Sequence, residues 1–202
     1  MKRPRFDFSA GAAFAAAALL FFLRPGELAA LLPAIIVHEL GHLAAIWALG
    51  LAPAGFRAEA GGFLIEVQGD AGPAGQGLIA AAGPLAGLLY AWAAARLSVA
   101  PGREWLALSA GLSLLLSLFN LLPVPLLDGG RLCAALASAL PNARLGERLC
   151  RLLGLAAALA VLAAGLATLR RGGGAAPALV GARLLFSAVQ DGEGLVKTNR
   201  IR

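Results

Sequence analysis

A chain of 202 residues, of which 59% are hydrophobic and 14% are charged, is not an ordinary soluble domain, because soluble domains carry about 25% charged residues. The mean hydropathy of +0.79 excludes a disordered or nucleic-acid-binding tail, which needs the opposite composition. The net charge of +6 is spread between the apolar segments and over the chain ends. In a membrane protein that pattern sets orientation, so we expect a polytopic membrane protein in a lipid bilayer, with no nucleic-acid partner.

Six hydrophobic segments approach the length that crosses a hydrocarbon core, which is about 20 apolar residues. In chain order they are about 9–23, 27–50, 76–96, 104–122, 147–169 and 174–190. Basic residues precede the first segment as in a signal peptide, but five further segments follow, which favours an uncleaved first span. Pro33 lies inside the second segment, where neighbouring helices can satisfy the freed backbone groups. The pattern predicts an all-α polytopic membrane protein with about six transmembrane helices.

Two stretches interrupt the helical pattern. The first, 51–75, contains two prolines and six glycines, which rule out a continuous helix. Within it, 62–67 alternates as a short strand does, and 56–59 is a candidate partner in a hairpin that turns at Gly61-Gly62. We therefore expect a short membrane-associated β-hairpin between the second and third spans.

The second interruption runs from Asn120 to Gly130, where Pro123 and Pro125 force an extended passage. The apolar segment that follows, 129–140, is too short to span a membrane. Unwound backbone at membrane depth is tolerated only where it is buried in protein or lines a cavity. Both interruptions are therefore candidate walls of a functional site.

Lysines and arginines predict the orientation. With the N-terminus inside, eleven of them fall in the inner regions and five in the outer regions, with the pair Arg170-Arg171 against the trend. Cytoplasmic regions of membrane proteins carry the excess of these residues. We expect a multi-pass protein of the cell membrane with both termini in the cytoplasm.

The two histidines of the chain are His38 and His42, in the string His-Glu-Leu-Gly-His. Positions i and i+4 of a helix share one face, so both imidazoles can reach one metal ion. Glu39 is displaced round the helix and can reach a metal-bound water. Zinc lowers the pKa of such a water to about 7, and a glutamate can take its proton. Ionisable residues inside a membrane span indicate function, whereas the structural alternative is a hydrogen-bonded polar pair within a helix bundle.

A catalytic zinc ion needs a third protein ligand. Cys133 and Cys150 show no ligand spacing, so we expect neither a metal role nor a disulfide for them. Asp128 stands out among the acids, because it lies in apolar sequence after the proline passage and is followed by Gly129-Gly130. The other interpretation of Asp128 is a helix N-cap for the segment that follows.

The string 38–42 on a membrane helix, followed by Asn-Leu-Leu-Pro-Val-Pro-Leu-Leu-Asp-Gly at 120–129, resembles the site-2 protease family of intramembrane zinc metalloproteases. The resemblance covers about 30–140, and the six-segment layout is similar to the bacterial branch that includes the sporulation factor IV FB protease. What it implies is one zinc ion per chain, bound by His38, His42 and Asp128. Glu39 would be the catalytic base, and Asn120 would line the site and steady the substrate carbonyl.

We expect a single membrane-embedded metalloprotease domain, 1–202, with its catalytic core at about 27–140, because no repeat or appended soluble domain is visible in the sequence. The additional helices would be about 9–23, 147–169 and 174–190. One stretch departs from the family: 82–87 resembles its third-segment Gly-Pro motif, but Gly87 stands where many members have an asparagine. We therefore expect these small residues to serve helix packing rather than the site.

We expect this chain to hydrolyse peptide bonds in or next to transmembrane segments of membrane-associated substrates. Such a protease must hold a helical substrate extended, and an exposed strand edge can do so by adding it as another strand. Phe63, Leu64 and Ile65 are the expected substrate-binding edge. The alternative is that the hairpin only plugs the cavity or packs against the helices.

Two other functions share the histidine motif. Membrane zinc proteases that act on soluble or lipidated substrates take a downstream glutamate as third ligand, and no glutamate after residue 104 stands in an apolar setting. A metal-binding or transport protein without hydrolysis would not need Glu39 beside the metal. No motif names the substrate or a regulatory partner.

Overall fold

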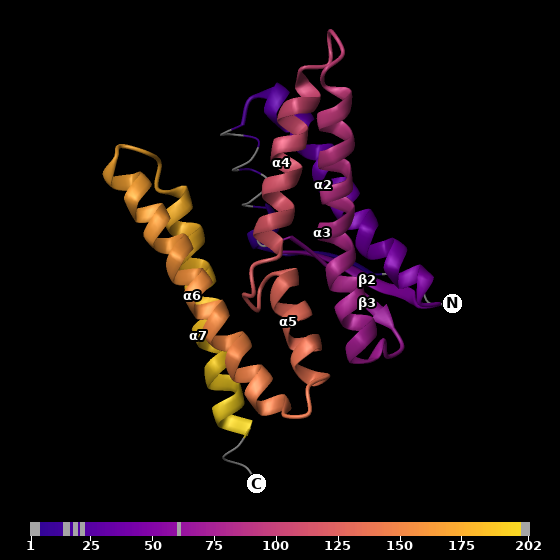
Figure 1. Ribbon diagram of the computed structural model, residues 1–202, viewed down its shortest axis with the longest axis vertical. Helices are drawn as coiled ribbons and strands as arrows, with labels where there is room; N and C mark the ends of the chain where they lie inside the picture. Colours follow the sequence, from indigo (N-terminus) through magenta and orange to yellow (C-terminus); the bar gives the residue numbers. More distant parts are fainter. Residues whose placement is uncertain (1–4, 14–16, 18–19, 21–22, 60–61, 199–202) are drawn as a thin grey trace. The chain divides into compact units, whose positions relative to one another are not determined.

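A computed structural model describes residues 5–13, 17, 20, 23–59 and 62–198 of the chain (Figure 1). In chain order the elements are β1 (Arg5–Phe8), α2 (Pro25–Ala48), β2 (Ala52–Glu59), β3 (Gly62–Gln68), α3 (Gly72–Leu97), α4 (Trp105–Asn120), α5 (Asp128–Ser138), α6 (Ala143–Arg170) and α7 (Ala176–Thr198). They form two compact units, Met1–Asn120 and Leu121–Arg202.

The protein is a mostly helical membrane protein. Among the described residues, α2, α3 and α6 are long and apolar enough to cross a membrane, whereas α4 and the Ala176–Gln190 part of α7 are apolar but shorter. The five hydrophobic segments predicted after residue 26 are all confirmed as helices. The prediction for 9–23 lies partly outside the described residues.

The prediction of an all-α protein with one hairpin is incomplete, because the sheet has three strands in the order β1-β2-β3. The hairpin of β2 and β3 is confirmed, and β1 pairs with β2 in parallel. Strand β1 was not predicted, because its four residues are too few for a periodic signal. Phe6 of β1 stacks on Phe56, with ring centroids 5.2 Å apart. Because of this pairing, the N-terminal strand and the hairpin lie on the same side of the first unit.

Helices α2, α3 and α4 pack side by side in the first unit (Figure 1). Gly41 of α2 lies so close to α3 that a Cβ atom there would sit 2.5 Å from the Ala82 carbonyl oxygen and 2.7 Å from the Ala86 Cβ. Small residues let helix backbones approach in this way. The close approach brings the histidine motif against α3.

A row of buried serines on α4 faces this helix pair. Ser109, Ser113 and Ser117 are spaced by four residues and are fully buried. The Ser109 hydroxyl donates to the Ala30 carbonyl of α2 at 2.7 Å, and the Ser113 hydroxyl donates to the Gly87 carbonyl of α3 at 2.8 Å. The Ser117 hydroxyl lies against the Cα of Gly87. The packing role predicted for Gly87 is therefore confirmed.

In the second unit, α6 offers a face of small residues to α5. A Cβ atom at Gly146 would sit 2.9 Å from Ala137 of α5. One turn further along α6, Cys150 forms a disulfide with Cys133 of α5, with Cα atoms 5.9 Å apart. The expectation that the cysteines have no disulfide role is therefore wrong. Their separation of 17 residues carries no spacing signal, and only the antiparallel helix pair brings them together.

Candidate metal centre

The two histidines of α2 point their ring nitrogens at each other. His38 and His42 are both buried, and their Nε2 atoms lie 3.2 Å apart. Two nitrogens bound to one tetrahedral zinc ion, each at about 2.0–2.1 Å, are separated by about 3.3 Å. The observed separation therefore fits two imidazoles that share one ion.

The ring of His42 is held in place by α3. Its Nδ1 donates to the carbonyl oxygen of Ile79 at 2.8 Å, which leaves the lone pair on Nε2 for a metal. Gly83 of α3 lies against the same ring, and a Cβ atom there would collide with Nε2 of His42. Gly83 therefore packs against α2, as expected for 82–87, and its lack of a side chain leaves room for the His42 ring. The Gly-Pro pair was the available sequence signal, whereas nothing in the sequence marked Ile79.

Glu39 follows His38 directly on α2 and is half-buried. Successive residues of an α-helix are about 100° apart round the axis. Glu39 therefore projects from the flank of the face that carries the two imidazoles. This position suits a group that acts beside a metal rather than on it.

Asp128 is the first residue of α5, in the second unit. The N-cap of this helix is Leu127, with no side-chain cap hydrogen bond, so the N-cap interpretation of Asp128 is wrong. Asp128 is 9% exposed, and its Oδ1 lies 3.8 Å from the Arg131 guanidinium one turn later. A carboxylate in the first turn is also favoured by the helix dipole. The helix start thus stabilises the buried carboxylate of Asp128.

Two glycines allow the proline passage to fold onto the start of α5. A Cβ atom at Gly129 would meet the carbonyl oxygens of Leu121 and Leu122, and one at Gly130 would meet the carbonyl of Val124. On the α6 side, a Cβ atom at Gly154 would meet the Pro123 carbonyl. The extended backbone before Asp128 is therefore enclosed by protein, which is the condition for unwound chain at membrane depth.

One set of three residues could hold a metal ion in the part of the chain that the structure describes: His38, His42 and Asp128. Two imidazoles and one carboxylate form a donor set that zinc accepts, with a fourth position left for water or substrate. This is the set that the resemblance implied.

The predicted substrate-binding residues lie in two places. Asn120 ends α4, is half-buried, and donates from Nδ2 to the Leu116 carbonyl at 3.0 Å. Phe63, Leu64 and Ile65 lie in β3. The Ile65 side chain packs against a cluster that contains Ile79, the residue whose carbonyl holds His42. The strand and the histidine motif therefore rest on one apolar cluster.

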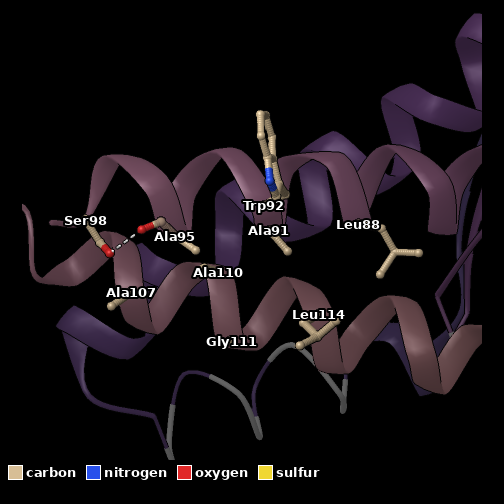
Figure 2. A pocket seen from close by; sticks show the side chains of 9 residues that line it. All are labelled: Leu88, Ala91, Trp92, Ala95, Ser98, Ala107, Ala110, Gly111 and Leu114. Atoms are coloured by element: carbon tan, nitrogen blue, oxygen red, sulfur yellow. Dashed lines mark hydrogen bonds between the residues drawn. The ribbon is translucent and has the colours of Figure 1, made fainter.

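A groove of about 410 Å³ lies elsewhere in the first unit, between α3 and α4 (Figure 2). It is lined by Leu88, Ala91, Trp92, Ala95, Ser98, Ala107, Ala110, Gly111 and Leu114. No ionisable side chain and no predicted site residue belongs to this lining. The Ser98 hydroxyl is turned back onto the Ala95 carbonyl at 2.8 Å, so the groove offers an apolar surface and no chemistry.

Two comparisons with known proteins find similar sequences or structures. The model of Peptidase family M50 matches residues 96–163, which include the 120–129 motif. Among solved structures, the site-2 protease from Methanocaldococcus jannaschii superposes with a TM-score of 0.67 at 21% identity, covering 92% of this chain and 89% of that one. At this identity the likeness shows a shared fold. No curated protein matches the chain.

Replacing Gly83 by alanine should displace the His42 ring, because the added Cβ occupies the space of its Nε2. We expect zinc affinity, measured by chelator competition on the purified protein, to fall about tenfold or more. Gly87→Ala is the matched control one turn away, where the added Cβ meets the Ser117 hydroxyl instead of an imidazole. Equal losses in the two variants would show that general helix packing, and not the His42 ring, is affected.

Proposed function

We infer that this chain is an intramembrane metalloprotease of the M50, site-2 protease type, which hydrolyses peptide bonds in or next to transmembrane segments. The observation that carries the inference is the pair of buried imidazoles whose Nε2 atoms lie 3.2 Å apart on an apolar helix. The M50 match over 96–163 and the site-2 protease fold support the same activity.

We assign roles to the site residues as follows. His38, His42 and Asp128 would hold one zinc ion per chain, and Glu39 would take a proton from the attacking water. The zinc ion, when bound, supplies a Lewis acid and a water of lowered pKa. The hydrogen bond from His42 to Ile79 fixes the tautomer in which Nε2 carries the lone pair that a metal ion needs. Asn120 would orient the substrate carbonyl.

We propose six membrane spans with both termini in the cytoplasm, in a single metalloprotease domain. The pairing of β1 with β2 supports an even number of crossings between the N-terminus and the hairpin. The order of helices supports similarity to the bacterial branch that includes the sporulation factor IV FB protease.

We propose that β3 binds the substrate along its free edge. Within the described sheet β3 pairs with β2 alone, so its other edge can accept an added strand. Strand addition replaces the hydrogen bonds of a substrate helix and exposes the peptide bond. The packing of Ile65 against the Ile79 cluster supports a fixed position of this edge relative to His42.

Glu39→Gln should effectively abolish cleavage, with the turnover rate of a membrane substrate lower by about a hundredfold or more, while zinc stays bound. The measurement pairs the zinc content of the purified protein with substrate turnover. Glu27→Gln, in the first turn of the same helix, should change neither, because a glutamine oxygen can still accept the hydrogen bond from the Arg24 N–H. Loss of zinc, or persistent cleavage, would overturn the role of Glu39. Zinc binding without turnover in the unaltered protein would favour a metal-binding or transport function.

Asp128→Asn should lower zinc occupancy and activity together, because a neutral amide oxygen is a poorer ligand than a carboxylate. Asp70→Asn is the control. The Asp70 Oδ1 accepts a hydrogen bond from the Gly72 N–H at 2.8 Å, and an asparagine oxygen can accept the same bond. If Asp70→Asn proves the sensitive variant in metal analysis, the third ligand is wrongly assigned.

Proline at Leu64 or at Ile65 tests the strand edge. Successive N–H groups of a strand point to opposite edges, so one of the two prolines removes a donor from the free edge. We expect that variant to lose cleavage of a helical membrane substrate while it retains zinc, and to cleave a short extended peptide nearly normally. Turnover of the helical substrate equal to that of the unaltered protein in both variants would remove the edge from the mechanism.

A further inference from the structure

The Cys133–Cys150 disulfide lies close along the chain to the predicted metal ligand of the second unit. Cys133 follows Asp128 by five residues on α5, which has only 11 residues. So short a helix is not stable on its own and depends on its contacts with neighbouring segments. In this unit those contacts are the glycine contacts with α6 and the proline passage, and the disulfide.

The disulfide is partly accessible and lies in a basic segment of the chain. Both cysteines are half-buried, and the neighbouring arginines are exposed. Arg148 and Arg151 flank Cys150 in the sequence of α6, and Arg131 precedes Cys133 on α5. Exchange requires that an external thiolate reach one of the two sulfurs, and the partial exposure of both cysteines allows this.

The same arginines lie in a region that the proposed orientation assigns to the cytoplasmic side. Glutathione and thioredoxin-like dithiols keep cytosolic thiols reduced, and the disulfides that do form there in mesophiles are usually transient or redox-sensing. A disulfide at this place is therefore expected to exchange rather than to act as a permanent cross-link.

We propose that Cys133 and Cys150 form a reversible thiol–disulfide site, reduced by a cytosolic dithiol, whose oxidised state holds α5 firmly and so strengthens metal binding by Asp128. The coupling to metal rests on the proposed function, whereas the thiol–disulfide exchange does not.

A thiolate of the dithiol attacks one sulfur of the pair, the Cys133–Cys150 bond breaks, and the other cysteine leaves as a thiolate that takes up a proton. The second thiol of the reductant then attacks the mixed disulfide and releases the cysteine that was bound in it. Two electrons pass to the protein, and the reductant becomes a disulfide. Oxidised glutathione reverses the reaction, with two equivalents of glutathione as products.

Reduction removes the covalent tie between α5 and α6 but leaves the glycine contacts at Gly146 and Gly154 in place. The unit therefore stays folded, while the short helix that begins at Asp128 gains freedom. Weakened support of a ligand typically costs about tenfold or more in metal affinity. We expect a change of about tenfold between the two redox states.

The test uses the full chain in lipid nanodiscs, equilibrated in glutathione buffers of graded redox ratio. Alkylation followed by mass spectrometry counts the free thiols, and chelator competition measures zinc affinity in the same samples. The expected result is conversion between zero and two thiols within the glutathione range, with zinc affinity about tenfold lower in the reduced state. A Cys133→Ser/Cys150→Ser double variant should keep the lower affinity at every ratio.

Four outcomes would overturn the proposal or its coupling to the metal. If no glutathione ratio reduces the Cys133–Cys150 bond, the disulfide is a permanent cross-link. If no ratio oxidises the two thiols, the pair is not a thiol–disulfide site. Conversion without any change in zinc affinity removes the coupling to Asp128. A chain that binds no zinc in either state refutes the metalloprotease function and the coupling, and the thiol count still decides whether exchange occurs.

Discussion

The hydrogen bond from His42 to the Ile79 carbonyl is the interaction on which the arrangement of the first unit depends. It requires α2 and α3 to lie in backbone contact, and the glycines at 41 and 83 make that contact possible. The same Ile79 belongs to the apolar cluster that supports β3. One helix–helix contact therefore orients the imidazole, makes room for it, and anchors the sheet. In a bilayer, where lipid offers no hydrophobic drive for helix association, such close contacts are a principal source of stability.

Residues with a strong local pattern could be predicted from the sequence. The apolar segments after residue 26 are helices, and the hairpin of β2 and β3 is present. The nearness of His38 to His42 could be predicted, because a separation of four residues places both rings on one side of a helix. Asp128 could be singled out, because a carboxylate in apolar sequence has few structural explanations.

Features that depend on contacts distant in sequence could not be predicted. Ile79 contributes a backbone carbonyl, a group that every residue carries, so no side-chain pattern marks it. The pairing of Cys133 with Cys150 follows from the turn between two helices and from small residues on both. Strand β1 has four residues, and its partner β2 lies some fifty residues further along the chain. In each case the structure is decided by contacts between residues that are distant in the sequence.

The serines of α4 limit how the first unit can move. Ser109 is bonded to α2 and Ser113 to α3, so α4 is tied to two helices from a single face. A slide of one residue or a rotation of one step would break both bonds at once, and apolar surroundings offer no replacement donors. These two bonds favour motion of the three helices as one body. Any opening that admits a substrate must therefore use the segments outside this trio, before the start of α3 and after the end of α4.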